Sequence, residues 1–133
     1  MQIGILEPSD FSKVAIEKLE SVGQVTKFSG EDLDIFLMEK DVLFIRLSYV
    51  ISKDFMNMAK KLKYLCTPTT GLNHIDLQEC KARDVEVISL KGEIDFLSTI
   101  RATPEHTFGL TLSLLRKYKS CFLSDNNKSW NRD

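Results

Sequence analysis

Short apolar runs alternate with amphipathic helical segments, and this alternation most constrains how the chain of 133 residues can fold. Five runs have the length and composition of strands, at residues 3–6, 25–28, 42–45, 64–66 and 85–88. Runs that are apolar throughout indicate strands buried on both faces, and helices between strands place the sheet in the parallel class. The sequence therefore predicts an α/β fold: a flavodoxin-like, doubly wound parallel five-stranded sheet with the order 2-1-3-4-5.

Capping residues predict where the connecting helices begin. Ser9 or Asp10 is placed to cap a first helix that ends at Gly23. Asp76 and Glu79 have capping-box spacing for the fourth helix. The second and third helices are expected over residues 32–38 and 55–62.

The last apolar segment predicts a long extra C-terminal helix. Thr103 is placed to cap it, Pro104 suits its first turn, and it is expected to run to about Lys119. Burying its six large apolar side chains would stabilise by roughly 9–18 kcal/mol, comparable with the whole stability of a domain, about 5–15 kcal/mol. One face can pack on the sheet, and the rest calls for another domain or subunit. The six are Phe108, Leu110, Leu112, Leu114, Leu115 and Tyr118.

Charge and cysteine content argue against several classes of partner. The chain carries 18 basic and 19 acidic residues, a net charge of -1, which gives no electrostatic reason to expect nucleic acid or a membrane. Residues 1–10 lack the pattern of a signal peptide, and no stretch reaches the length of a membrane span. The odd number of widely spaced cysteines, Cys66, Cys80 and Cys121, predicts reduced thiols in a cytoplasmic protein.

Polar residues follow three of the expected strands, at the sheet edge where ligands bind in open parallel sheets. Residues 67–71 are rich in hydroxyls and can present backbone N–H groups to an anion. Arg46 can add a bidentate contact with a carboxylate. These features predict a site for a small organic acid. The alternative is that Thr69 and Thr70 only complete a turn and that Arg46 pairs with a surface carboxylate.

Three further expectations concern single residues near this edge. Gly71 should adopt a backbone conformation that is costly for other residues, because it ends a strand and must bring N–H groups close to a ligand. His74 is expected to be an exposed loop residue. Cys66 is expected to be a small buried hydrophobe, not a nucleophile.

Two motifs resemble the substrate-binding domain of the D-isomer-specific 2-hydroxyacid dehydrogenases. Residues 69–76, Thr-Thr-Gly-Leu-Asn-His-Ile-Asp, are similar to the family's Gly-Val-Gly-Val-Asp-Asn-Ile-Asp run, with threonine in place of its first glycine. Residues 104–107, Pro-Glu-His-Thr, are similar to its Ala-Glu-His-Thr-like helix start. Arg46 and Arg116 match arginines of the family, while residues 90–103 replace its Asn-Ala-Pro-Gly-like segment.

The resemblance implies roles for particular residues. Thr70, Gly71 and Leu72 would hold the substrate carboxylate through backbone N–H groups, and Arg46 would add to this site. Thr107 would lie near the nicotinamide-side phosphate of the cofactor. The implied activity is hydride transfer between NAD and C2 of a small 2-hydroxy or 2-oxo acid.

The same comparison implies that parts of the enzyme are missing from this chain. No two of the six glycines are separated by one residue, so the Gly-x-Gly-x-x-Gly fingerprint is absent. The family's catalytic Arg, Glu and His lie in or beyond its nucleotide-binding domain and have no counterpart here. We therefore expect an inactive fragment with no catalytic residue and no metal site, which does not bind NAD alone.

The expected organisation has three parts. A substrate-binding domain spans residues 1–101, an interdomain or dimer helix spans 102–120, and 121–133 form a linker towards a Rossmann domain. A homodimer through residues 104–119 is expected.

Three alternative functions share this fold class. A receiver domain needs an Asp at the end of the third strand, where Arg46 stands, and a flavodoxin needs a phosphate loop where residues 7–10 stand. A free-standing module for dimerisation or small-acid binding, without catalysis, is the remaining alternative.

Overall fold

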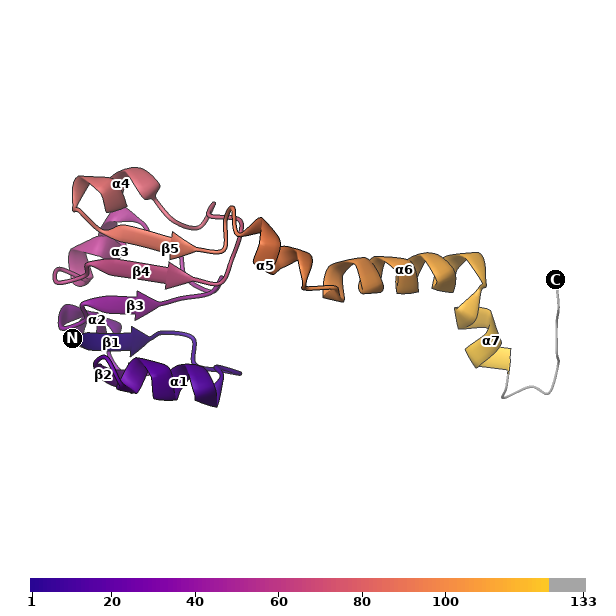
Figure 1. Cartoon of the computed structure of the whole chain (residues 1–133), viewed down its shortest axis with the longest axis horizontal. Helices are drawn as coiled ribbons and strands as arrows, with labels where there is room; N and C mark the ends of the chain where they lie inside the picture. Colours follow the sequence, from indigo (N-terminus) through magenta and orange to yellow (C-terminus); the bar gives the residue numbers. More distant parts are fainter. Residues whose placement is uncertain (125–133) are drawn as a thin grey trace. The chain divides into compact units, whose positions relative to one another are not determined.

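The computed structural model describes residues 1–124, which form two units, Met1–Gly92 and a second that begins at Glu93. Residues 125–133, most of the expected linker, lie outside the described part. The first unit contains a parallel sheet of order β2-β1-β3-β4-β5 (Figure 1), which confirms the predicted fold class and strand order. The strands are β1 (Gln2–Ile5), β2 (Gln24–Lys27), β3 (Val42–Phe44), β4 (Tyr64–Thr67) and β5 (Glu86–Ser89).

Four helices cover this sheet unequally. They are α1 (Lys13–Glu20), α2 (Leu33–Met38), α3 (Lys53–Met58) and α4 (Leu77–Ala82). The main core includes Leu37 of α2, Met56 of α3 and Cys80 of α4, which lie over one face of the sheet. The opposite face has only a small buried cluster, against which Leu19 of α1 packs.

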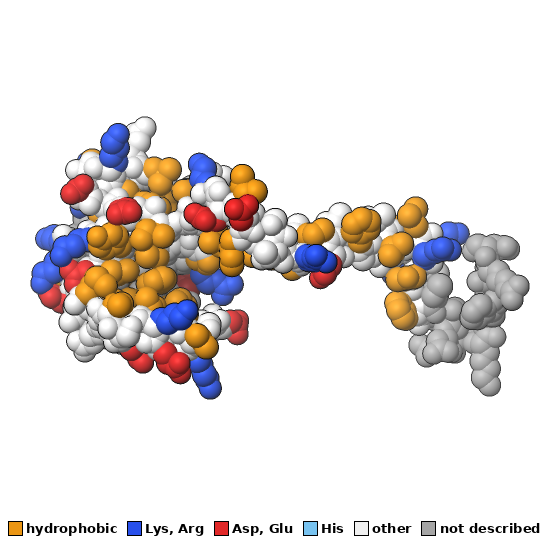
Figure 2. Space-filling model, in the orientation of Figure 1, with side chains coloured by type: hydrophobic (Ala, Val, Ile, Leu, Met, Phe, Trp, Pro, Cys, Tyr) orange, Lys and Arg blue, Asp and Glu red, His pale blue; other side chains and the backbone are white. Residues whose placement is uncertain are grey.

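The half of that second face formed by β4 and β5 has no helix of the first unit over it. Tyr64 is 38% exposed and Ile88 is 48% exposed, although both point to the α1 side in the strand register. Figure 2 shows apolar side chains gathered on this face. Parallel sheets normally have both faces covered, so this surface suits a partner element.

The loops after β3 and β4 are held together beyond the ends of the strands. Ile51 and Ile75 form an isolated parallel bridge. The Ile51 backbone N–H donates to the His74 backbone carbonyl at 2.7 Å, and the Asp76 N–H donates to the Ile51 carbonyl at 2.9 Å. These bonds keep two of the polar loops at the carboxyl edge of the sheet side by side.

Capping side chains mark the starts of α2, α3 and α4. The Asp76 side chain accepts from the backbone N–H groups of Gln78 and Glu79, which caps α4, and Asp32 caps α2 in the same way. The predicted cap of α1 is wrong. Ser12 occupies the N-cap position, and Asp10 lies in a left-handed turn with φ of 59°, a conformation that Asp tolerates better than most residues.

The second unit differs from the expected single helix. It contains α5 (Ile94–Ser98), α6 (Ala102–Leu115) and α7 (Tyr118–Ser124). Arg101, not Thr103, is the N-cap residue of α6. The helix ends before the expected Lys119 because Lys117 adopts a positive φ of 50°. The short helix α5 has no counterpart in the prediction.

The apolar residues of α6 all remain exposed within the described chain. Phe108 is 71% exposed and Leu114 is 80% exposed, and the helix contributes no buried residue. The expectation that one face of this helix packs on the sheet stays a prediction, since the sheet and α6 belong to different units. Across residues 1–124 no helix combines the length and apolar character needed to cross a membrane.

Replacing Asp76 with Ala should lower the free energy of unfolding by about 1 kcal/mol, because two N–H groups at the start of α4 lose their acceptor. Urea denaturation of the two proteins measures the difference. Gln78→Ala, in the first turn of the same helix, is the control and should change stability by less than about 0.5 kcal/mol. An equal effect of both substitutions would contradict the capping role.

Candidate functional site

The candidate site lies at the carboxyl ends of β1, β3 and β4, where ligands bind in open parallel sheets. The loops after these strands enclose a cavity of about 350 Å³. Phe11 and Phe44 contribute apolar lining, and their rings meet edge to face with centroids 5.7 Å apart. Glu7, Asp10 and Arg46 contribute charged groups. The cavity therefore combines an apolar wall with one cation and two carboxylates.

Glu7 binds the backbone of the loop after β3. One carboxylate oxygen accepts from the Arg46 N–H at 2.7 Å, and the other accepts from the Ser48 N–H at 3.2 Å and the Ser48 hydroxyl at 2.7 Å. Partial burial acts to raise the pKa of Glu7, but hydrogen bonds from Ser48, Arg46 and Leu47 outweigh it and hold the pKa below the ordinary 4.5. Glu7 is thus a carboxylate at neutral pH.

The Arg46 guanidinium is available to an anion. Its Nη1 donates to the Ser9 carbonyl at 3.4 Å. In the described part of the chain, no carboxylate forms an ion pair with it. The alternative that Arg46 is occupied by a surface carboxylate is not what the structure shows.

The loop after β4 also has unused donors. The backbone N–H groups of Thr70, Gly71 and Leu72 donate to no acceptor within residues 1–124. Thr69, by contrast, completes the turn, since its hydroxyl donates to the Gly71 carbonyl at 2.9 Å and lies 3.1 Å from the Thr67 hydroxyl. Three consecutive free N–H groups form the kind of surface that binds a carboxylate.

The prediction for the Gly71 backbone is wrong. Among the described glycines, positive φ angles occur at Gly30 and Gly92, and Gly71 is not in this region. A Cβ at Gly71 would meet no atom within 4 Å. The turn is instead closed by the Thr69 side chain, so glycine is not required here for backbone reasons.

The structure brings only some of the predicted residues into one cavity. Arg46 and Pro68 line it, while Thr70, Gly71 and Leu72 lie on the same edge of the sheet outside its lining. Leu72 is half-buried and packs on the main core. Thr107 belongs to the second unit, where its hydroxyl donates to the Thr103 carbonyl at 2.9 Å.

His74 and Cys66 lie close to this edge. His74 is half-buried, not exposed as predicted, and its Nε2 is a buried nitrogen without a hydrogen-bond partner in the described residues. Cys66 is 8% exposed, and burial, with a smaller effect of Glu86, raises the pKa of its thiol to about 11. The interpretation of Cys66 as a buried hydrophobe is confirmed.

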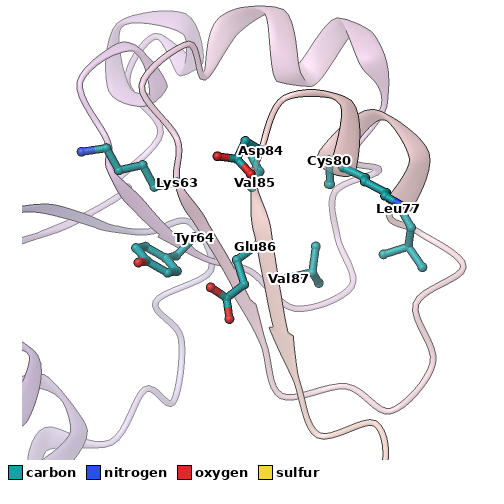
Figure 3. A pocket seen from close by; sticks show the side chains of 9 residues that line it. Lys63, Tyr64, Leu77, Cys80, Asp84, Val85, Glu86 and Val87 are labelled. Carbon is teal, nitrogen blue, oxygen red and sulfur yellow. The ribbon is translucent and has the colours of Figure 1, made fainter.

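A larger cavity of about 530 Å³ lies at the opposite end of the sheet. It surrounds the start of β5, between Tyr64 and Glu86 on one side and Leu77 and Val87 on the other (Figure 3). It lies away from the carboxyl ends of the strands and is not the candidate site. No group of three His, Cys, Asp or Glu side chains suited to a metal ion occurs in the described chain.

The fold agrees with comparisons to known proteins. Residues 5–107 match the family model "D-isomer specific 2-hydroxyacid dehydrogenase, catalytic domain". The chain belongs to this family.

Three similar proteins show how much of the relatives this chain spans. D-3-phosphoglycerate dehydrogenase of Bacillus subtilis is 30% identical over 92 residues, which are 69% of this chain and 17% of the relative. The enzyme of the same name from Methanocaldococcus jannaschii is 27% identical over 133 residues, 98% of this chain and 24% of the relative. D-lactate dehydrogenase of Aquifex aeolicus, solved with NAD and lactic acid, superimposes with a TM-score of 0.80 at 17% identity, over 100% of this chain and 39% of that one. The chain thus spans less than half of each of these relatives.

Cys66 should react with iodoacetamide at pH 8 about 100-fold more slowly in the folded chain than in urea. The rise of its pKa from 9.0 to about 11 lowers the thiolate fraction by about that factor, and the thiolate is the nucleophile. Mass spectrometry of the peptide that contains Cys66 measures the rate. Equal rates in the two conditions would show that this thiol is accessible and unperturbed.

Proposed function

We propose that this chain is the substrate-binding domain of an oxidoreductase that transfers a hydride between NAD and C2 of a 2-hydroxy or 2-oxo acid. The observation that carries the proposal is the set of unused donors at one edge of the sheet. These are the N–H groups of residues 70–72 and the Arg46 guanidinium. Membership of the dehydrogenase family supports the assignment of the reaction.

In this proposal the loop after β4 binds the carboxylate of the acid. Hydrogen bonds from Thr70, Gly71 and Leu72 to a carboxylate are charge-assisted and shorter than neutral ones. Arg46 adds a cation that binds a second anionic or polar group of the substrate. The task of these residues is to orient C2 and its oxygen, and they carry out no proton transfer themselves.

The residues present do not form a site for a whole dinucleotide. The turn after β1 consists of Glu7, Pro8 and Ser9, where a dinucleotide-binding fold has closely spaced glycines. NAD supplies hydride chemistry to the relative that was solved with it. For this chain we propose only that Thr107 contributes to a cofactor phosphate held by a nucleotide-binding domain, and that the chain alone is inactive.

The cellular location that we propose is the cytoplasm. Cys66 and Cys80 are free and buried, which supports the reducing environment of the cytoplasm as the proposed location.

Addition of D-lactate to the ¹⁵N-labelled chain should shift the amide resonances of Thr70, Gly71 and Leu72. Arg46→Ala should weaken this binding about tenfold or more, since a charged hydrogen bond contributes about 1.5–3 kcal/mol. Nuclear magnetic resonance titration at millimolar ligand measures both effects.

Lys63→Ala is the control for loss of one positive charge. Lys63 is exposed, just before the amino end of β4, and pairs with Asp41 at 3.2 Å, so its loss should leave acid binding unchanged. NAD added to the wild-type chain should leave the spectrum unchanged. Acid-induced shifts confined to other loops would refute the proposed site.

A second proposed property is self-association through residues 104–119. The exposed apolar side chains of α6 cover more than one stripe of the helix, and exposed apolar patches of this kind drive association. This surface also supports the alternative function of a dimerisation module without catalysis.

Leu112→Ser combined with Leu115→Ser should convert a dimer into a monomer in sedimentation velocity at crystallisation concentrations. The two leucines are 48% and 74% exposed, so the change removes apolar surface without opening a core. Ile35→Ser on α2, at a residue 68% exposed, is the control and should leave the dimer intact. A monomeric wild-type chain would refute association through α6.

A further inference from the structure

Glu7 determines the shape of the loop after β3, from a distant position in the sequence. The register of the sheet brings Glu7 next to this loop. Strand β1 pairs with β3, and the Leu6 N–H donates to the Phe44 carbonyl at 2.9 Å. The next residue, Glu7, therefore stands beside Arg46. Its two oxygens accept from Arg46 and Ser48 at 2.7–3.2 Å.

We propose that Glu7 is a positioning residue of the acid site, which holds the loop at residues 46–48 so that the Arg46 guanidinium stays free for the substrate. This inference rests on the proposed function, since it assumes that Arg46 contacts the acid. Glu7 itself touches no substrate in this arrangement and acts through the loop.

The hydrogen bonds explain why Glu7 does not neutralise its neighbour. A carboxylate beside an arginine usually forms a bidentate pair with the guanidinium. Here both oxygens are occupied by the Arg46 backbone and by Ser48, and the guanidinium donates only to the Ser9 carbonyl. The same interaction that orders the loop therefore keeps the cation available.

The loss of charge and the loss of positioning predict opposite changes in acid affinity for the same substitution, Glu7→Gln. Glu7→Gln removes a negative charge near an anionic ligand, so simple electrostatics predicts tighter acid binding. Gln has one acceptor oxygen in place of two, so it cannot bind both Arg46 and Ser48 through oxygen. If positioning dominates, the loop spends less time in the competent shape and binding weakens in proportion.

The experiment measures D-lactate binding by resonance titration in the wild-type chain and in the Glu7→Gln variant. We expect the dissociation constant to rise about fivefold or more. The amide resonances of Arg46 and Ser48 should move, because they lose a charged acceptor. Ser48→Ala, which removes only the hydroxyl bond, should give an intermediate loss of affinity.

The chain contains a matched control. Glu31 accepts from the Ser29 N–H at 2.8 Å and the Ser29 hydroxyl at 2.7 Å, in the loop after β2. Glu31→Gln removes the charge of another carboxylate that binds a loop N–H and a serine hydroxyl, and it should leave the dissociation constant unchanged.

Each outcome is decisive. Unchanged or tighter binding in Glu7→Gln, with normal binding by the wild-type chain, overturns the positioning role and leaves the proposed function intact. A loss of affinity of the same size in Glu31→Gln also overturns it, because the effect is then not specific to this loop. No binding by the wild-type chain refutes the proposed function, and the role of Glu7 with it.

Discussion

The pairing of β3 with β1 and β4 is the interaction on which the rest of the structure depends. It aligns the carboxyl ends of the three strands, so loops far apart in sequence meet at one edge. The bridge between Ile51 and Ile75 extends this pairing past the strands. Because the strands are buried and parallel, slipping their register by one residue would turn core side chains outward. The geometry of the site therefore depends on the packing of the buried strands.

The edge that results combines two kinds of donor. Arg46 offers a cation, and the loop after β4 offers three backbone N–H groups without acceptors. Glu7 accepts hydrogen bonds from Arg46 and Ser48 and so orders the loop after β3. A carboxylate is the ligand that we propose for this surface, and membership of the dehydrogenase family supports that proposal.

Two apolar surfaces support the proposal that this part of the chain meets other elements. Ile88 and Tyr64 lie on a half-face of the sheet that no helix of the first unit covers, and the exposed apolar side chains of α6 cover more than one stripe of the helix. Both surfaces are expected where a domain works next to another domain or subunit.

Local sequence patterns determined the strands, their parallel order and the Asp76 cap of α4. The runs at residues 42–45 and 64–66 are apolar throughout, which only a buried parallel strand explains well, and Asp76 caps its helix with its own side chain. Some strand ends differ by one residue from the prediction. At the edge strand β5, whose side chains are only partly buried, the prediction was 85–88 and the strand is Glu86–Ser89. The family motif at residues 69–76 was likewise readable from the sequence alone.

Tertiary structure decided the features that depend on contacts between distant residues. The role of Glu7 requires β1 to lie beside β3, 39 residues along the chain, and no local pattern contains that information. The Gly71 turn is different, because it is closed by a local hydrogen bond from the Thr69 hydroxyl two residues away, without a positive φ. The end of α6 at Lys117 and the partial burial of His74 were also outside the reach of local patterns. Sequence periodicity specifies which face of an element is buried, whereas the partners of a polar side chain are set only when the strands are in register.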